Sequence, residues 1–126
     1  MEVKINAMGT FEEPEVVNIT DGNYVELASV GGKWAYGYRI DCAPIKQRVD
    51  CSVLNEMFES RENALQAALI QIQHKVLYAS SYRQYIVEET NSFEKGNQAI
   101  NVPCILLAIE DLQRKLVLKV LDDIFP

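Results

Sequence analysis

The residues able to do chemistry are one histidine, His74, and three cysteines, Cys42, Cys51 and Cys104. A cysteine held beside His74 would make a nucleophile and base pair. A single histidine and the lack of any Cys-x-x-Cys sequence exclude the usual spacing of zinc ligands. We expect a solvated or hydrogen-bonded helical histidine and free, buried thiols. Cys42 and Cys51 flank an expected hairpin loop, which permits a disulfide between them but does not require one.

Other catalytic patterns are missing from the sequence. Neighbouring acids at i and i+1 on a helix do not face each other, which applies to the pairs Glu88-Glu89, Glu110-Asp111 and Asp122-Asp123. The chain has no glycine-rich phosphate loop and no Gly-x-Ser-x-Gly nucleophile elbow. The sequence therefore predicts no catalytic residue, no cofactor site and no metal site, and hence a protein that is not an enzyme.

The chain of 126 residues has a net charge of −6, and its acidity is concentrated in the first half. Residues 1–60 hold ten acids against five bases, whereas residues 61–126 hold eight against seven. Such a surface repels a phosphate backbone. The plain interpretation of the acidity is solubility, and the more specific one is a surface complementary to a basic partner.

The length of the chain fits one domain, residues 1–126. No run of 18 apolar residues predicts a membrane span, and the N-terminus lacks the basic start and apolar stretch of a signal peptide. Three cysteines fit a reducing compartment. We therefore expect a cytoplasmic protein without membrane contact.

A hairpin over residues 23–40 is the best-defined element. If Gly31 and Gly32 form a two-residue turn, Leu27 faces Tyr36 across the hairpin. Side chains alternate along a strand, so one face collects the large apolar residues, and a one-residue slip would expose all of them. These residues are Val25, Leu27, Trp34, Tyr36, Tyr38 and Ile40. Aromatic residues on a sheet can also stack on bases. Here their alignment with Val25 and Leu27 favours a buried floor beneath a helix.

Other strands and helices follow from shorter patterns. We expect weaker strands over residues 2–9, 15–20 and 48–54, with a loop over 43–47. Ser60 is a good N-cap for a helix over residues 61–78, and Ser81 with Gln84 either caps a second helix or lies in one bent continuous helix. A loop over 91–98 leads to a last helix over 103–122. The expected fold is an α+β domain, with an N-terminal antiparallel sheet of three to five strands packed against two or three C-terminal helices.

The last helix has more apolar surface than packing on one side requires. One stripe holds Ile105, Ile109, Leu112, Leu116 and Val120, and Leu106, Val117 and Leu121 widen it. Leu107 and Leu118 lie outside this stripe. Such a helix is either sandwiched in the core or in contact with another subunit, which would make a homodimer. The hairpin's opposite face adds Tyr24, Glu26, Lys33 and Arg39, so the candidate interaction surface is Tyr24, Glu26, Lys33, Arg39, Leu107 and Leu118.

Residues 32–38 (GKWAYGY) and residues 58–64 (FESRENA) carry a family resemblance. Together with the segment around them, residues 23–78, they resemble a small β-β-β-α module of bacterial mobile elements and phages, similar in shape to the arm-type DNA-binding domains of phage integrases. The resemblance implies this shape and a mobile-element setting. DNA binding is not carried over, because the exposed face offers only Lys33 and Arg39, beside Glu26.

These patterns lead to two functional hypotheses. The first is a non-enzymatic protein-interaction module of a bacterial, phage or plasmid system, motivated by the acidic sheet half and the wide apolar helix. The alternative is a nucleic-acid-binding accessory domain that uses Arg39, Lys33 and the strand nearby, with binding that falls steeply with salt.

Overall fold

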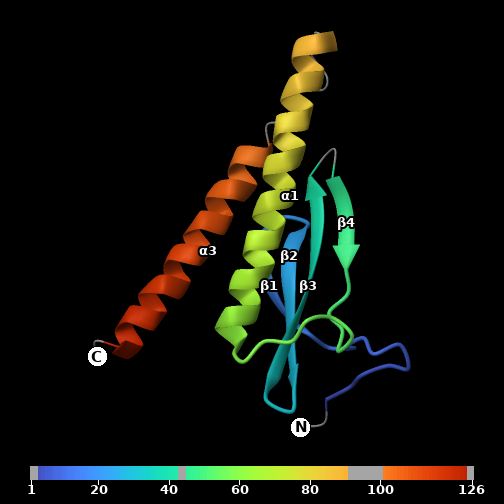
Figure 1. Ribbon diagram of the computed structural model, residues 1–126, viewed down its shortest axis with the longest axis vertical. Helices are drawn as coiled ribbons and strands as arrows, with labels where there is room; N and C mark the ends of the chain where they lie inside the picture. The colour runs from blue at the N-terminus through green and yellow to red at the C-terminus, as the bar shows by residue number, and fades with distance from the viewer. Residues whose placement is uncertain (1–2, 43–44, 91–100, 125–126) are drawn as a thin grey trace.

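The protein folds as a four-stranded antiparallel sheet followed by two long helices (Figure 1). The computed structural model describes residues 3–42, 45–90 and 101–124, with side chains except those of residues 42, 79–90 and 101–103. The strands lie in the order β1-β2-β3-β4. The elements are β1 (Glu15–Thr20), β2 (Asn23–Val30), β3 (Lys33–Cys42), β4 (Ile45–Val49), α1 (Arg61–Thr90) and α3 (Asn101–Ile124). The α+β class predicted from the sequence is confirmed.

The central hairpin has the predicted register. Strand β2 pairs with β3 from Tyr24↔Arg39 to Val30↔Lys33, with Leu27 opposite Tyr36. The turn residues Gly31 and Gly32 have φ angles of 60° and 80°. A two-residue turn of this kind needs positive φ at both positions, so glycine suits both.

Helix α1 covers the predicted apolar face of the sheet, which we call the inner face. The Ser60 hydroxyl accepts a hydrogen bond from the Asn63 amide at 3.1 Å, so Ser60 caps the helix as expected. Side chains from the inner face and both helices form one core: Val25, Leu27, Tyr38, Ile40, Ala64, Leu65, Ala68, Leu69, Ile72, Val76, Ile105 and Ile109. Trp34 and Tyr36 are only partly buried against it.

The helices differ in extent from their predicted bounds. Helix α1 runs without a break to Thr90. Of the two alternatives at Ser81, the structure therefore has one continuous helix and no second helix that begins there. Helix α3 begins at Asn101 and ends at Ile124, slightly beyond the predicted 103–122. The predicted loop over 91–98 lies outside the described residues. Within the described part of the chain, neither helix has an apolar stretch long enough to cross a bilayer.

After β4 the chain crosses over β3 to the outer face of the sheet, the face turned away from α1. The crossing occurs above Gly37, where an added Cβ would lie 2.4 Å from the Cys51 nitrogen and 2.5 Å from the Val49 oxygen. The predicted strand over 48–54 is therefore wrong: β4 ends at Val49, and its first residues fall in the predicted loop over 43–47. Because the chain changes faces, Val49 packs against the main core whereas Cys51 is buried with Ala35 on the outer face.

The N-terminal segment, described from residue 3, also lies on the outer face, and its described residues form no regular strand before β1. The predicted strand over 2–9 is replaced by a tight turn, in which the Asn6 side-chain oxygen accepts hydrogen bonds from the amides of Met8 and Thr10. The Phe11 amide then donates to the Cys51 carbonyl at 2.9 Å. Phe11, Ala35 and Cys51 form a second small core with Ala28, Val53 and Met57.

The crossing predicts a strict requirement for glycine at position 37. We expect Gly37→Ala to lower the free energy of unfolding by about 3 kcal/mol, because the new methyl group meets backbone atoms that cannot move aside independently. Gly31→Ala is the control, since its site is open and only its positive φ is unfavourable, which costs about 1 kcal/mol. Urea unfolding measures both, and equal losses would contradict the crossing.

Candidate interaction surface

The six predicted surface residues do not form one surface. Tyr24 and Arg39 are cross-strand partners, so both lie on the outer face of the sheet. Lys33 is at the other end of β3 from Arg39, beside the Gly31-Gly32 turn, where it forms an ion pair with Glu59. Leu107 and Leu118 are on α3, where their side chains are 65% and 53% exposed. Helix α3 packs with α1 and β1.

Glu26 is not on the surface, which corrects its place in the predicted set. It faces Gly37 across the hairpin and is 8% exposed, because the crossing chain covers it. Its Oε1 atom is buried and has no hydrogen-bond partner in the structure. Burial raises the pKa of Glu26, the Arg48 charge lowers it, and Asp50 adds to the rise.

Strand β4 adds two basic residues to the outer face that were not predicted there from the sequence. Arg48 lies directly opposite Arg39, and Lys46 lies opposite Asp41. Both arginines are near acids: Arg39 is 3.6 Å from Asp41, and Arg48 is 3.3 Å from Asp50. The bases on this face therefore occur with acids beside them.

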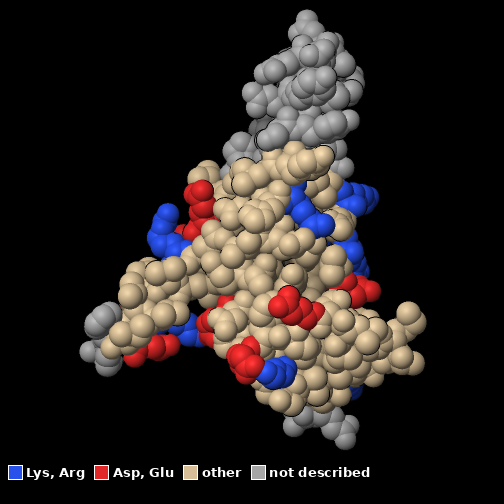
Figure 2. All heavy atoms as spheres, viewed as in Figure 1, with Lys and Arg blue, Asp and Glu red and all other residues tan. Residues whose placement is uncertain are grey.

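Among the side chains that the structure describes, the largest set of exposed apolar ones on one element is in the C-terminal part of α3. Ile105 and Ile109 are buried, but packing weakens along the helix, and Val120 is 47% exposed although it was predicted in the buried stripe. A second stripe at spacings of three and four residues faces solvent: Val117, Val120, Leu121 and Ile124. We call these four residues the α3 stripe. Figure 1 shows α3 diverging from α1 toward its C-terminal end, and Figure 2 shows this part as an arm.

A groove lies between the α3 stripe and the start of α1. It has a volume of about 250 Å³, with Leu116, Val117, Val120 and Leu121 on one side and Glu62, Asn63 and Gln66 on the other. Lys119 of α3 forms an ion pair with Glu62 of α1 across this end of the groove. The Gln66 Oε1 atom is buried without a hydrogen-bond partner. The groove therefore combines an apolar wall on α3 with a polar wall on α1. In the sequence, only the surplus width of the last helix indicated it.

Cys51 and His74 lie on opposite faces of the sheet and do not form a nucleophile and base pair, and the side chain of Cys42 lies outside the described residues. Cys51 is a free thiol on the outer face, and burial raises its pKa to about 12, so it is protonated at neutral pH. His74 is exposed on α1, which covers the other face of the sheet. Cys104 is an exposed free thiol on α3.

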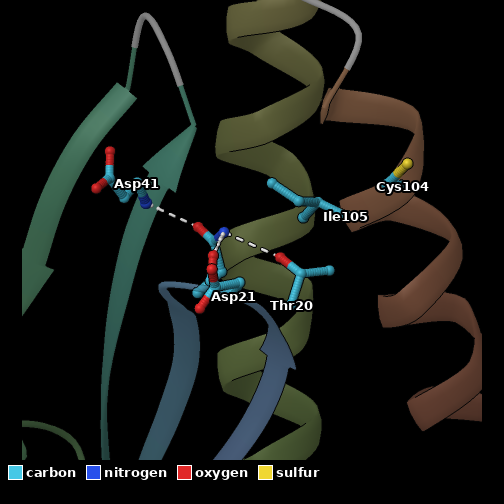
Figure 3. A pocket seen from close by; sticks show the side chains of 6 residues that line it. Thr20, Asp21, Asp41, Cys104 and Ile105 are labelled. Carbon is cyan, nitrogen blue, oxygen red and sulfur yellow. Dashed lines mark hydrogen bonds between the residues drawn. The ribbon is translucent and has the colours of Figure 1, made fainter.

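A polar pocket of about 280 Å³ lies where the β1–β2 turn meets the start of α3 (Figure 3). Its central residue, Asn23, is fully bonded: its oxygen accepts from the Asp41 amide at 2.7 Å, and its nitrogen donates to the Thr20 hydroxyl and the Asp21 carbonyl. Figure 3 shows the Asp41 carboxylate pointing away from Thr20 and Ile105. Asn23 thus links the β1–β2 turn to β3. Among the described residues, no three acidic, cysteine or histidine side chains lie close enough together to hold a metal ion.

Comparison of the chain with protein-family models, with curated proteins and with solved structures finds no match. No known site is therefore transferred to this surface, and its function is argued from its own geometry.

The buried Glu26 predicts a pH-dependent stability. Since its pKa is raised above the ordinary value of 4.5, the unfolded chain ionises first, and stability falls as the pH rises from about 4.5 through the folded pKa. We expect Glu26→Gln to raise the free energy of unfolding by about 1 kcal/mol at pH 7 and to change it little at pH 4. The exposed Glu12→Gln is the control, and a Glu26→Gln gain that is equal at both pH values would contradict this account.

Proposed function

We propose that this protein is a non-enzymatic protein-interaction module of a bacterial, phage or plasmid system, acting in the cytoplasm. The observation that carries the proposal is the α3 stripe. Its four side chains are between 43% and 60% exposed, on a helix whose other stripe is buried in the core. A helix that projects a second apolar stripe gains by burying it against another protein, at about 25 cal/mol for each Å² removed from water.

The partner is another protein or a second copy of this chain paired through α3. The stripe matches the helix-in-groove mode of recognition, in which residues at i, i+3, i+4 and i+7 anchor one partner on the other. The groove beside α1 extends this surface. The bacterial or phage setting rests on the resemblance of residues 23–78 to mobile-element modules.

The α3 stripe is tested by placing charges in it. We expect Val117→Asp with Leu121→Asp to weaken association at least about 30-fold, since residues central to an interface contribute about 2 kcal/mol or more. Leu54→Asp is the matched control, because Leu54 is 81% exposed but lies on the loop after β4. Sedimentation of the purified chain measures self-association, and affinity capture from a bacterial extract finds other partners. A strict monomer that captures no protein and turns over a substrate would refute the proposal.

A second candidate is a nucleic-acid-binding accessory domain that uses the outer face. It is favoured by one observation: β4 places Arg48 opposite Arg39, with Tyr24 next to Arg39 on β2. Arginine and tyrosine on an open sheet can contact phosphates and stack on bases. It is the weaker candidate, because Asp41 and Asp50 lie beside these arginines.

Salt dependence tests this second candidate. If the outer face binds single-stranded DNA, the double variant Arg39→Gln, Arg48→Gln should weaken binding and reduce the slope of log K against log salt by about 1.4. Arg114→Gln on α3 is the control and should leave the slope unchanged. No retention of the wild-type chain on DNA or RNA at low salt would end this candidate.

A further inference from the structure

A pocket of about 270 Å³ lies on the inner side of the sheet, between β3, β4, α1 and the loop that leads to α1. It is lined by Tyr36, Tyr38, Val49, Asn55, Glu56 and Gln71. The volume is below the roughly 300–1,000 Å³ of pockets that take whole small molecules. The pocket therefore fits a single side chain better than a cofactor.

Two tyrosine rings form the aromatic wall of the pocket. Tyr36 and Tyr38 are stacked, with ring centroids 6.2 Å apart and planes 20° apart. Phe58 lies 5.8 Å from Tyr36 and supports it from another direction. Phe58 is itself fixed by two backbone hydrogen bonds to Trp34, of 2.7 and 2.8 Å. The rings are thus held in place before anything binds, which limits the entropy lost on binding.

The remaining lining is acidic and polar. Glu56 brings an exposed carboxylate. Burial raises the pKa of Tyr36, and the neighbouring Tyr38 and the Glu56 charge add to the rise. The Asn55 side chain donates to the Asp50 carbonyl at 2.9 Å, which orients its amide. None of the described residues that line the pocket is basic, and the amine of Lys75, one turn beyond Gln71, donates to the Gln47 side-chain oxygen at 2.9 Å. The pocket presents the partly exposed Tyr36 ring, backed by the buried Tyr38, and the Glu56 carboxylate.

We propose that this pocket binds an arginine side chain of a basic protein partner. A guanidinium is planar, stacks on a tyrosine ring and donates several hydrogen bonds at once, here to the Glu56 carboxylate and the side-chain oxygens of Asn55 and Gln71. The excess of acids in residues 1–60 favours the approach of a basic chain. The site is separate from the α3 stripe, because α3 packs with α1 and β1 whereas the pocket borders β4 (Figure 1).

The test uses small probes with the purified full-length chain. N-acetyl-arginine amide is titrated while NMR follows the side chains of Tyr36, Asn55 and Gln71, and N-acetyl-citrulline amide serves as the neutral isostere. We expect saturable shifts at these residues with the arginine probe and none with the citrulline probe. Glu56→Gln, at an exposed position, should weaken binding about threefold or more, and Tyr36→Leu by a similar factor. Glu110→Gln on α3 is the matched control and should leave binding unchanged.

N-acetyl-lysine amide is titrated in the same way. Three outcomes overturn the proposal: the citrulline probe binds as tightly as the arginine probe, the lysine probe does so, or the Glu56→Gln variant binds the arginine probe as tightly as the wild-type chain. The result is distinguishable from a failure of the proposed function. Loss of arginine binding leaves association through the α3 stripe intact, and the Val117→Asp, Leu121→Asp variant still binds the arginine probe if the pocket is correct.

Discussion

The close approach of two backbone segments at Gly37 is the constraint on which the rest of this structure depends. Strand β4 pairs with β3 only as far as Val49, and the chain then crosses above Gly37, where there is no room for a side chain. Because of this crossing, β4 does not pair with the N-terminal half of β3. Phe58 pairs there with Trp34 instead. Ser60 caps α1 two residues later, so the pairing of Phe58 with Trp34 places the start of the main helix beside β3.

The crossing gives the two faces of the sheet different roles. The inner face is closed by α1 and carries the main core. The outer face is covered at one end by the N-terminal segment, and Phe11, Val53 and Met57 pack there around Ala35 and Cys51. It stays open at the other end, where Arg39 and Arg48 lie. Glu26 is buried under this cover, which is an electrostatic cost that the fold carries without a compensating hydrogen bond at Oε1. The loop that returns to α1 also supplies Asn55 and Glu56 to the tyrosine pocket.

The features that were predictable from the sequence depend on local patterns. The register of the central hairpin follows from alternating apolar residues and the Gly31-Gly32 turn, and the start of α1 follows from Ser60. The crossing was not predictable, because Gly37 within a strand has no local sign of the distant segment above it. Two errors follow from this: Glu26 was placed on the surface, and residues 48–54 were assigned to one strand. In α3, Val120 continues the buried stripe by spacing, but the divergence of the helix from α1 leaves it exposed.

The central claim is that the C-terminal part of α3 is uncovered in the isolated chain and is covered only by a partner. Amide hydrogen exchange along α3, measured on dilute purified protein, tests this most directly, since protection reports local packing. The account predicts slow exchange around Ile105 and Ile109, fast exchange from Val117 to Ile124, and slower exchange in that second region once a partner or a second copy binds. Equally slow exchange in both regions of a dilute monomer would contradict it, because the α3 stripe would then already be covered within the chain.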